Sequence, residues 1–214
     1  MAKDRPDLVA LRLLSDVFGL SEPPLFRERL AVYRDLVSTW NVLVPLLSAT
    51  DLRNAFYAHV ADSLALVPLV RQYVCSGYRY LDVGTGNGLP AVPILLYLDS
   101  YCGVLVERNA RKAAFLRVSI SKLQLVSTEL VEGSFPEVIE PTGECVLTAR
   151  AMEKPERFLE NLALGALGNG VFLRQSGSRA ATLPPGLVES PVHDAFDEAG
   201  LRRGHLGEVR ALDK

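Results

Sequence analysis

Three glycines at alternate positions follow an acidic residue in the segment Tyr80–Pro90, YLDVGTGNGLP. The residues up to Val83 predict a strand, and Pro90 favours the start of a helix. Glycines at such a junction let the backbone approach a ligand closely, at the strand end where open α/β sheets bind ligands. We therefore expect ligand contacts from this loop and the strand before it, at Asp82, Gly84, Gly86 and Gly88.

The glycine spacing distinguishes between nucleotide-containing ligands. Dinucleotide-binding folds use G-x-G-x-x-G, whereas Gly88 comes one residue early and Leu89 stands in the expected place. The pattern G-x-G-x-G after a strand that carries Asp82 instead suits a ligand with an amino-acid end and a nucleoside end. S-adenosylmethionine is such a ligand.

An acidic residue closes the next predicted strand. Glu107 ends Cys102–Glu107, about twenty residues after the glycines, where a carboxylate can accept hydrogen bonds from both ribose hydroxyls. NAD and S-adenosylmethionine share those hydroxyls, so Glu107 does not separate the two ligands. The alternative is a strand-end acid that pairs with Arg108 or Arg111.

The elements that would position these residues form two parts. Residues 1–76 show apolar side chains at three- and four-residue steps, which predicts a helical N-terminal region, with helices over Asp51–His59 and Asp62–Tyr73 and a kink at Pro68. Residues 77–214 alternate short β-type runs with helices, the pattern of a doubly wound parallel α/β sheet. The predicted strands are Tyr80–Val83, Cys102–Glu107, Thr128–Val131, Cys145–Ala149 and Gly170–Arg174, and the helices between them Ala91–Leu98, Asn109–Leu123 and Pro155–Leu167.

Charge and cysteine content narrow the function classes. The 23 basic and 25 acidic residues give a net charge of −2, so no global positive field attracts a polyanion, although a local basic face remains possible. Three widely spaced cysteines, which we expect to be buried, indicate neither a disulfide framework nor a metal site. No apolar run is long enough to span a bilayer, and we expect a cytoplasmic protein.

Several stretches resemble the bacterial small-subunit (16S) ribosomal RNA guanine-N7 methyltransferases, also called glucose-inhibited division protein B. They are Trp40-Asn41, the segment Ala58–Ser63, the glycine loop with its Gly-Leu-Pro continuation, Arg111-Lys112 ahead of Phe115-Leu116-Arg117, and Ala149-Arg150-Ala151. The resemblance implies a Rossmann-like class I S-adenosylmethionine-dependent methyltransferase fold. It also implies methylation of guanine N7 in small-subunit ribosomal RNA.

The same resemblance implies roles for further residues. Gly84 and Leu89 match cofactor contacts, and Phe135 with Pro136 match residues that flank the adenine. Arg150 matches an arginine that contacts the cofactor region. Basic residues expected to face RNA are Arg111 and Lys112, with Arg174 as the replacement for a family lysine where this chain has Ser176. Other departures from the family pattern are Ala58, in place of arginine, and Pro45.

The implied reaction asks little of acids and bases. Neutral guanine N7 carries an exposed lone pair, so it attacks a sulfonium methyl group without first losing a proton. Catalysis then comes from alignment of the reacting atoms and desolvation of the sulfonium. Asp62 is our candidate for stabilising the charge that passes to the purine, and Arg150 and His59 complete the expected catalytic set.

Structural interpretations of these residues stay open. Asp62 or Ser63 could cap a helix, and Arg111 and Lys112 could belong to a solvated helix face. Because Arg150 is expected at a strand end on the surface, its replacement by Ala should reduce methyl transfer more than stability.

The expected partner is small-subunit ribosomal RNA or the 30S subunit. We expect the protein to act as a monomer, to bind no metal ion and not to associate with a membrane. Two other functions remain open. One is a methyltransferase acting on another RNA or a small molecule. The other is a non-catalytic, cofactor-binding protein associated with ribosomes.

Overall fold

The computed structural model describes residues 5–138, 144–150, 154–176, 181–202 and 204–212. Five helices precede its first strand: α1 (Pro6–Asp16), α2 (Phe26–Trp40), α3 (Ala49–Asn54), α4 (Phe56–Leu64) and α5 (Val67–Cys75). The strands are β1 (Arg79–Val83), β2 (Gly103–Glu107), β3 (Thr128–Glu132), β4 (Cys145–Ala149), β5 (Val171–Ser176), β6 (Leu187–Val192) and β7 (His205–Ala211). The remaining helices are α6 (Ala91–Tyr97), α7 (Ala110–Lys122), α8 (Pro155–Asn161), a π-helical turn (Leu162–Ala166) and α9 (Ala195–Glu198).

The described strands form one seven-stranded sheet in the order β3-β2-β1-β4-β5-β7-β6. Strands β1 to β5 are parallel, and β7 runs antiparallel to both β5 and β6. This confirms the α/β class and the doubly wound parallel sheet. The order reverses between β1 and β4, so the carboxyl ends of β2, β1 and β4 meet at one edge, where such sheets bind ligands.

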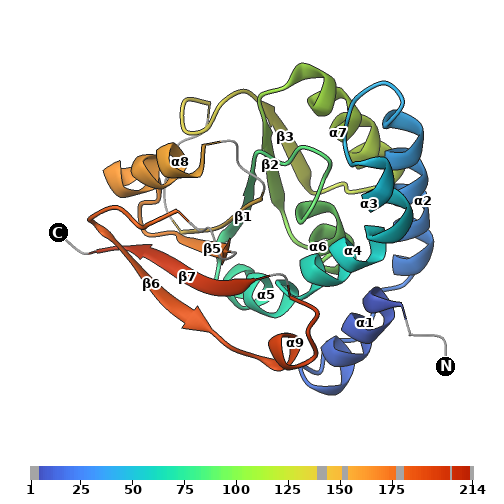
Figure 1. Ribbon diagram of the computed structural model, residues 1–214, viewed down its shortest axis with the longest axis horizontal. Helices are drawn as coiled ribbons and strands as arrows, with labels where there is room; N and C mark the ends of the chain where they lie inside the picture. The colour runs from blue at the N-terminus through green and yellow to red at the C-terminus, as the bar shows by residue number, and fades with distance from the viewer. Residues whose placement is uncertain (1–4, 139–143, 151–153, 177–180, 203, 213–214) are drawn as a thin grey trace.

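Helices cover the two faces of the sheet unequally (Figure 1). On one face, Phe158 and Leu159 of α8 pack against a cluster that includes Leu81 and Leu147. On the other face, buried residues of α1, α2 and α4 to α7 form a continuous cluster with the sheet through Tyr80, among others. The helices before the sheet therefore share a core with it.

Three predicted helices are divided in the structure, and the one expected over Pro155–Leu167 consists of α8 and the π-helical turn. The helix expected over Asp62–Tyr73 is wrong, because α4 ends at Leu64 and α5 begins at Val67 with Pro68 in its first turn. Proline lacks an N–H group, and the first turn is where a helix does not need one. The helix expected over Asp51–His59 is likewise divided between α3 and α4.

The expectation of three buried cysteines holds for Cys145 alone, since Cys75 and Cys102 are exposed. No helix in the described residues is both long and apolar enough to cross a membrane.

Candidate active site

The turn between β1 and α6 adopts the backbone conformation that its glycines predict. Gly84, Gly86 and Gly88 have φ angles of 70°, 58° and 93°, in the left-handed region that favours glycine. A Cβ atom on Gly88 would lie 2.7 Å from Val92 Cγ2. The Tyr33 hydroxyl of α2 donates a hydrogen bond of 2.7 Å to the carbonyl oxygen of Asn87. Helix α2 thus fastens the turn from outside the sheet.

Glu107 lies beside this turn at the carboxyl end of β2. Its side chain is almost wholly buried, and Oε2 accepts a hydrogen bond of 2.8 Å from Gly86 N. Its other oxygen, Oε1, accepts one of 2.7 Å from Asn109 N. Each carboxylate oxygen has a further lone-pair direction, so Glu107 can still accept hydroxyl donors from a ligand.

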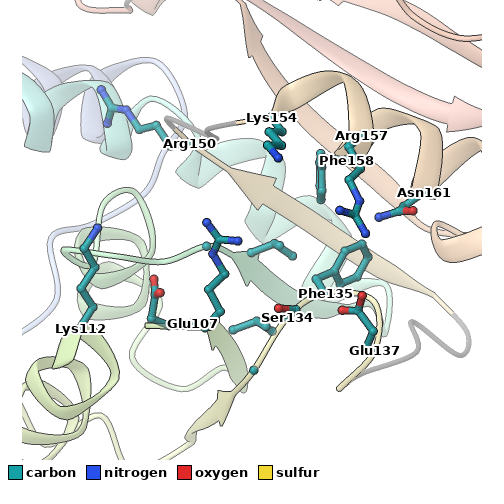
Figure 2. Close-up of a pocket in the computed structure, with 15 residues that line it drawn as sticks. Glu107, Lys112, Ser134, Phe135, Glu137, Arg150, Lys154, Arg157, Phe158 and Asn161 are labelled. Atoms are coloured by element: carbon teal, nitrogen blue, oxygen red, sulfur yellow. The ribbon is translucent and has the colours of Figure 1, made fainter. Parts of the chain in front are cut away.

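A cavity of about 270 Å³ opens at this edge of the sheet (Figure 2). Five predicted residues line it: Gly84, Glu107, Lys112, Phe135 and Arg150. Sequence reasoning missed ten lining residues: Val83, Val106, Arg108, Gly133, Ser134, Glu137, Lys154, Arg157, Phe158 and Asn161. Several of these occupy or directly follow strand ends, which is the signal that could have found them. Those on α8 carry no such signal.

Other predicted cofactor contacts lie outside this lining. Gly86 and Gly88 shape the turn, and Leu89 is buried, with its N–H donating to Asn87 Oδ1 at 3.0 Å. Pro136 follows Phe135, whose ring centroid lies 5.6 Å from that of Phe158. These residues support the site rather than face the cavity.

Asp82 is buried beneath the turn, with 1% of its surface exposed. Its Oδ1 accepts a hydrogen bond of 2.5 Å from Thr148 Oγ1, which joins β1 to β4. Burial raises the pKa of Asp82 from 3.8 to about 7, opposed by hydrogen bonds from Thr148 and Thr85 and by the charge of Arg150. Its carboxyl is therefore a support inside the sheet and does not line the cavity.

We expect Asp82 to make the folded state less stable as pH rises from about 4 to about 7. Between these pH values the native carboxyl keeps its proton, whereas the carboxyl in the unfolded chain has lost it. The free energy of unfolding is therefore highest below the pKa of the unfolded chain and falls as pH rises through the pKa of the folded protein. Asparagine does not titrate, so as pH rises the free energy of unfolding of Asp82→Asn, measured in urea, should approach or exceed that of the wild type. Asp16→Asn, at the exposed end of α1, is the control. The expectation would be contradicted if the difference in free energy of unfolding between wild type and Asp82→Asn stayed constant with pH.

The predicted catalytic set comes together as an ion-paired cluster between α4 and β4. Arg150 Nη2 lies 2.5 Å from Asp62 Oδ2 and 3.3 Å from His59 Nδ1. Gln175 Nε2 donates a hydrogen bond of 3.0 Å to Asp62 Oδ1. Asp62 lies inside α4 with 1% of its surface exposed, so it does not cap a helix. Arg150 is a partner of this buried carboxylate, so the premise that a strand-end surface arginine contributes little to stability is wrong.

The predicted RNA contacts occupy different surroundings. Arg111 and Lys112 begin α7, where Asn109 Oδ1 accepts hydrogen bonds from both of their backbone N–H groups. Arg174 is buried, lies 2.9 Å from Glu189 Oε2 and also donates to the carbonyl oxygen of Ala181. A buried arginine with these partners is a poor candidate for contact with RNA. The described residues contain no group of His, Cys, Asp and Glu side chains that could hold a metal ion.

Comparison with known proteins places these residues in a family. The family model described as GidB, rRNA small subunit methyltransferase G, matches residues 27–182. The chain belongs to this family. The GidB match includes α2 except its first residue, the glycine turn, Glu107 and the ion-paired cluster of Asp62 and Arg150.

Curated GidB relatives are similar over most of their length. A protein named "Ribosomal RNA small subunit methyltransferase G" from Xanthomonas campestris pv. campestris (strain 8004) is 35% identical over 188 residues, covering 87% of this chain and 80% of that protein. A protein of the same name from Xanthomonas oryzae pv. oryzae (strain MAFF 311018) is 33% identical over 179 residues, covering 78% and 79%.

Solved structures support the fold of this GidB member. The SAH-bound Podospora anserina methyltransferase PaMTH1 has a TM-score of 0.58 at 14% identity, covering 100% of this chain and 97% of that one. A point mutant of MtNAS in complex with S-adenosylmethionine has a TM-score of 0.53 at 18% identity, covering 95% and 77%. These likenesses agree with a class I methyltransferase fold.

Proposed function

We propose that the chain transfers a methyl group from S-adenosylmethionine to N7 of a guanine in small-subunit ribosomal RNA. Membership of the GidB family supports the enzyme class and the RNA substrate. The observation that carries the proposal is the meeting of Gly84, Glu107, Phe135 and Arg150 around one cavity at the carboxyl edge of the sheet. The choice of N7 rests on the resemblance of the sequence motifs.

The cavity residues fit such a cofactor. Glu107 keeps lone-pair directions for ribose hydroxyls, and Gly84 brings backbone to the cavity without a Cβ in the way. Phe135, half-buried at the lining, offers an aromatic face for the adenine. When bound, S-adenosylmethionine would supply an activated methyl group on its sulfonium.

The protein's own contribution is to bind, orient and exclude water. Neutral N7 needs no general base, and the described lining contains neither histidine nor cysteine. We assign Arg150 to the site itself, whereas Asp62 and His59 contact it and act as positioning residues. This revises the direct role expected for Asp62, because a carboxylate already paired with Arg150 has its charge balanced.

We further propose that the two parts of the chain have different roles. Residues 77–214 would hold the cofactor, and residues 1–76 would complete the site through His59 and Asp62. We also propose that the enzyme works as a monomer in the cytoplasm, where ribosomal subunits are found.

The test is methyl transfer from labelled S-adenosylmethionine to small subunits purified from a strain that lacks this activity. Nuclease digestion and nucleoside mass spectrometry should reveal a new 7-methylguanosine peak. Cofactor binding in a calorimeter without any methylated nucleoside would overturn the proposal. It would favour a small-molecule enzyme or a non-catalytic, cofactor-binding protein, and would direct attention to Ala58, Pro45 and Ser176.

A further inference from the structure

Basic side chains outnumber acidic ones around the cavity, although the chain as a whole has a net charge of −2. The basic lining residues are Arg108, Lys112, Arg150, Lys154 and Arg157, and the acidic ones are Glu107 and Glu137. The proposed cofactor does not explain this excess. S-adenosylmethionine carries a sulfonium, an ammonium and one carboxylate, so it is itself a cation and would be repelled by a basic lining. The excess therefore indicates a second, anionic occupant.

Three of these cations also lack the ion pairs common elsewhere on the surface. Arg27 lies 2.7 Å from Glu22 Oε2, and Arg117 lies 3.3 Å from Glu132 Oε2. By contrast, Lys112, Lys154 and Arg157 form no salt bridge with any residue that the structure describes. Lys154 and Arg157 are exposed, and Lys112 is half-buried. Their charge is available to a partner.

The three cations stand on two sides of the cavity (Figure 2). Lys112 belongs to α7, on the sheet face covered by most of the helices. On the other face, Lys154 directly precedes α8 and Arg157 lies in its first turn. Glu107 lies between the two sides. A chain of phosphates that crosses the mouth of the cavity would meet cations before and after the point where one base enters.

We propose that Lys154 and Arg157, opposite Lys112, bind backbone phosphates of the RNA on both sides of the guanine that is methylated. This inference rests on the proposed function and adds α8 to the RNA-binding surface. It replaces Arg174, whose guanidinium is buried against Glu189. Contacts between these side chains and phosphates give an affinity for RNA that falls as the salt concentration rises. Such contacts do not depend on the RNA sequence.

The test compares Lys154→Gln, Arg157→Gln and the double variant with the wild type in two assays. One measures direct binding to unmethylated small subunits over a series of salt concentrations, and the other measures methyl transfer. Arg71→Gln is the matched control, because Arg71 is exposed, has no salt bridge in the described residues and lies on α5, which leads to the opposite end of β1.

We expect the double variant to bind subunits roughly 10- to 100-fold more weakly. Its salt slope should be reduced by about 1.5 to 2, since each phosphate contact contributes about 0.7 on a single strand and about 0.9 on a duplex. Its affinity for S-adenosylmethionine in a calorimeter should not fall, because the variant removes two cations that repel a cationic cofactor. Every property of Arg71→Gln should stay within about twofold of wild type. Subunit binding and salt slope equal to wild type in the double variant would overturn the inference while leaving the proposed function standing. Weakened binding in the double variant, with no transfer even by the wild type, would support the phosphate contacts of Lys154 and Arg157 but overturn both the proposed function and their placement around a methylated guanine.

Discussion

Gly84→Arg is expected to abolish measurable binding of S-adenosylmethionine while leaving the protein folded. Gly84 lines the cavity with φ of 70°, so an arginine there fills space beside Glu107 and adds a further positive charge against a cationic cofactor. The backbone cost of a non-glycine residue in this region is about 1–2 kcal/mol, too little to unfold a typical domain. Calorimetric titration with the cofactor measures the loss, which should exceed roughly 100-fold, or about 2.7 kcal/mol.

Gly19→Arg separates the two effects of this substitution. Gly19 has a similar φ of 64°, no atom within 4 Å of an added Cβ, and no place in the cavity lining. The Gly19→Arg variant therefore has the same backbone strain but does not fill the cavity, so it should bind the cofactor like the wild type. If Gly84→Arg binds as tightly as Gly19→Arg, the cavity is not the cofactor site.

Removing one partner of the Asp62–Arg150 pair is expected to reduce both stability and methyl transfer. Arg150→Met leaves the carboxylate of Asp62 buried without its closest cation, and Asp62→Leu does the reverse. Loss of one partner from a buried pair costs about 3–5 kcal/mol, which urea titration can measure. Each single variant should also lose methyl transfer by roughly 100-fold or more, since aligned groups at an active site tolerate little displacement.

The double variant distinguishes stability from function. Asp62→Leu with Arg150→Met removes both charges together, and a buried ion pair replaced by apolar residues is often neutral in stability. The free energy of unfolding should return most of the way to the wild-type value, while methyl transfer to small subunits stays low. Recovery of transfer along with stability would show that the pair has only a structural role.

Much of the sheet can be predicted because its strands are short apolar runs separated by turns. The strand Cys145–Ala149 has the same bounds in prediction and structure, and spacing alone identifies Gly84 and Glu107 as cavity residues. A parallel sheet places consecutive strand ends at one edge, so residues at those ends are near each other whatever the details of packing.

The rest of the site depends on tertiary contacts that local patterns do not encode. Lys154 and Arg157 face the cavity because α8 packs through Phe158, and a helix of seven residues gives too little periodicity to show which side faces inward. The sequence predicts Arg174 at the RNA, but β6 lies where Glu189 can pair with it. The burial of Asp62 likewise depends on contacts with residues distant in the sequence, Arg150 after β4 and Gln175 of β5.

The hydrogen bond from Tyr33 to Asn87 makes the geometry of the glycine turn depend on the helices before the sheet. Asn87 also donates a hydrogen bond of 3.1 Å through Nδ2 to the carbonyl oxygen of Leu46. Two residues of the N-terminal region, Tyr33 and Leu46, therefore hold Asn87 in place. A substitution that loosens α2 can thus change ligand affinity without altering any lining residue. The two parts of the chain are consequently not interchangeable modules: grafting a different helical segment onto this sheet would require the same two anchors.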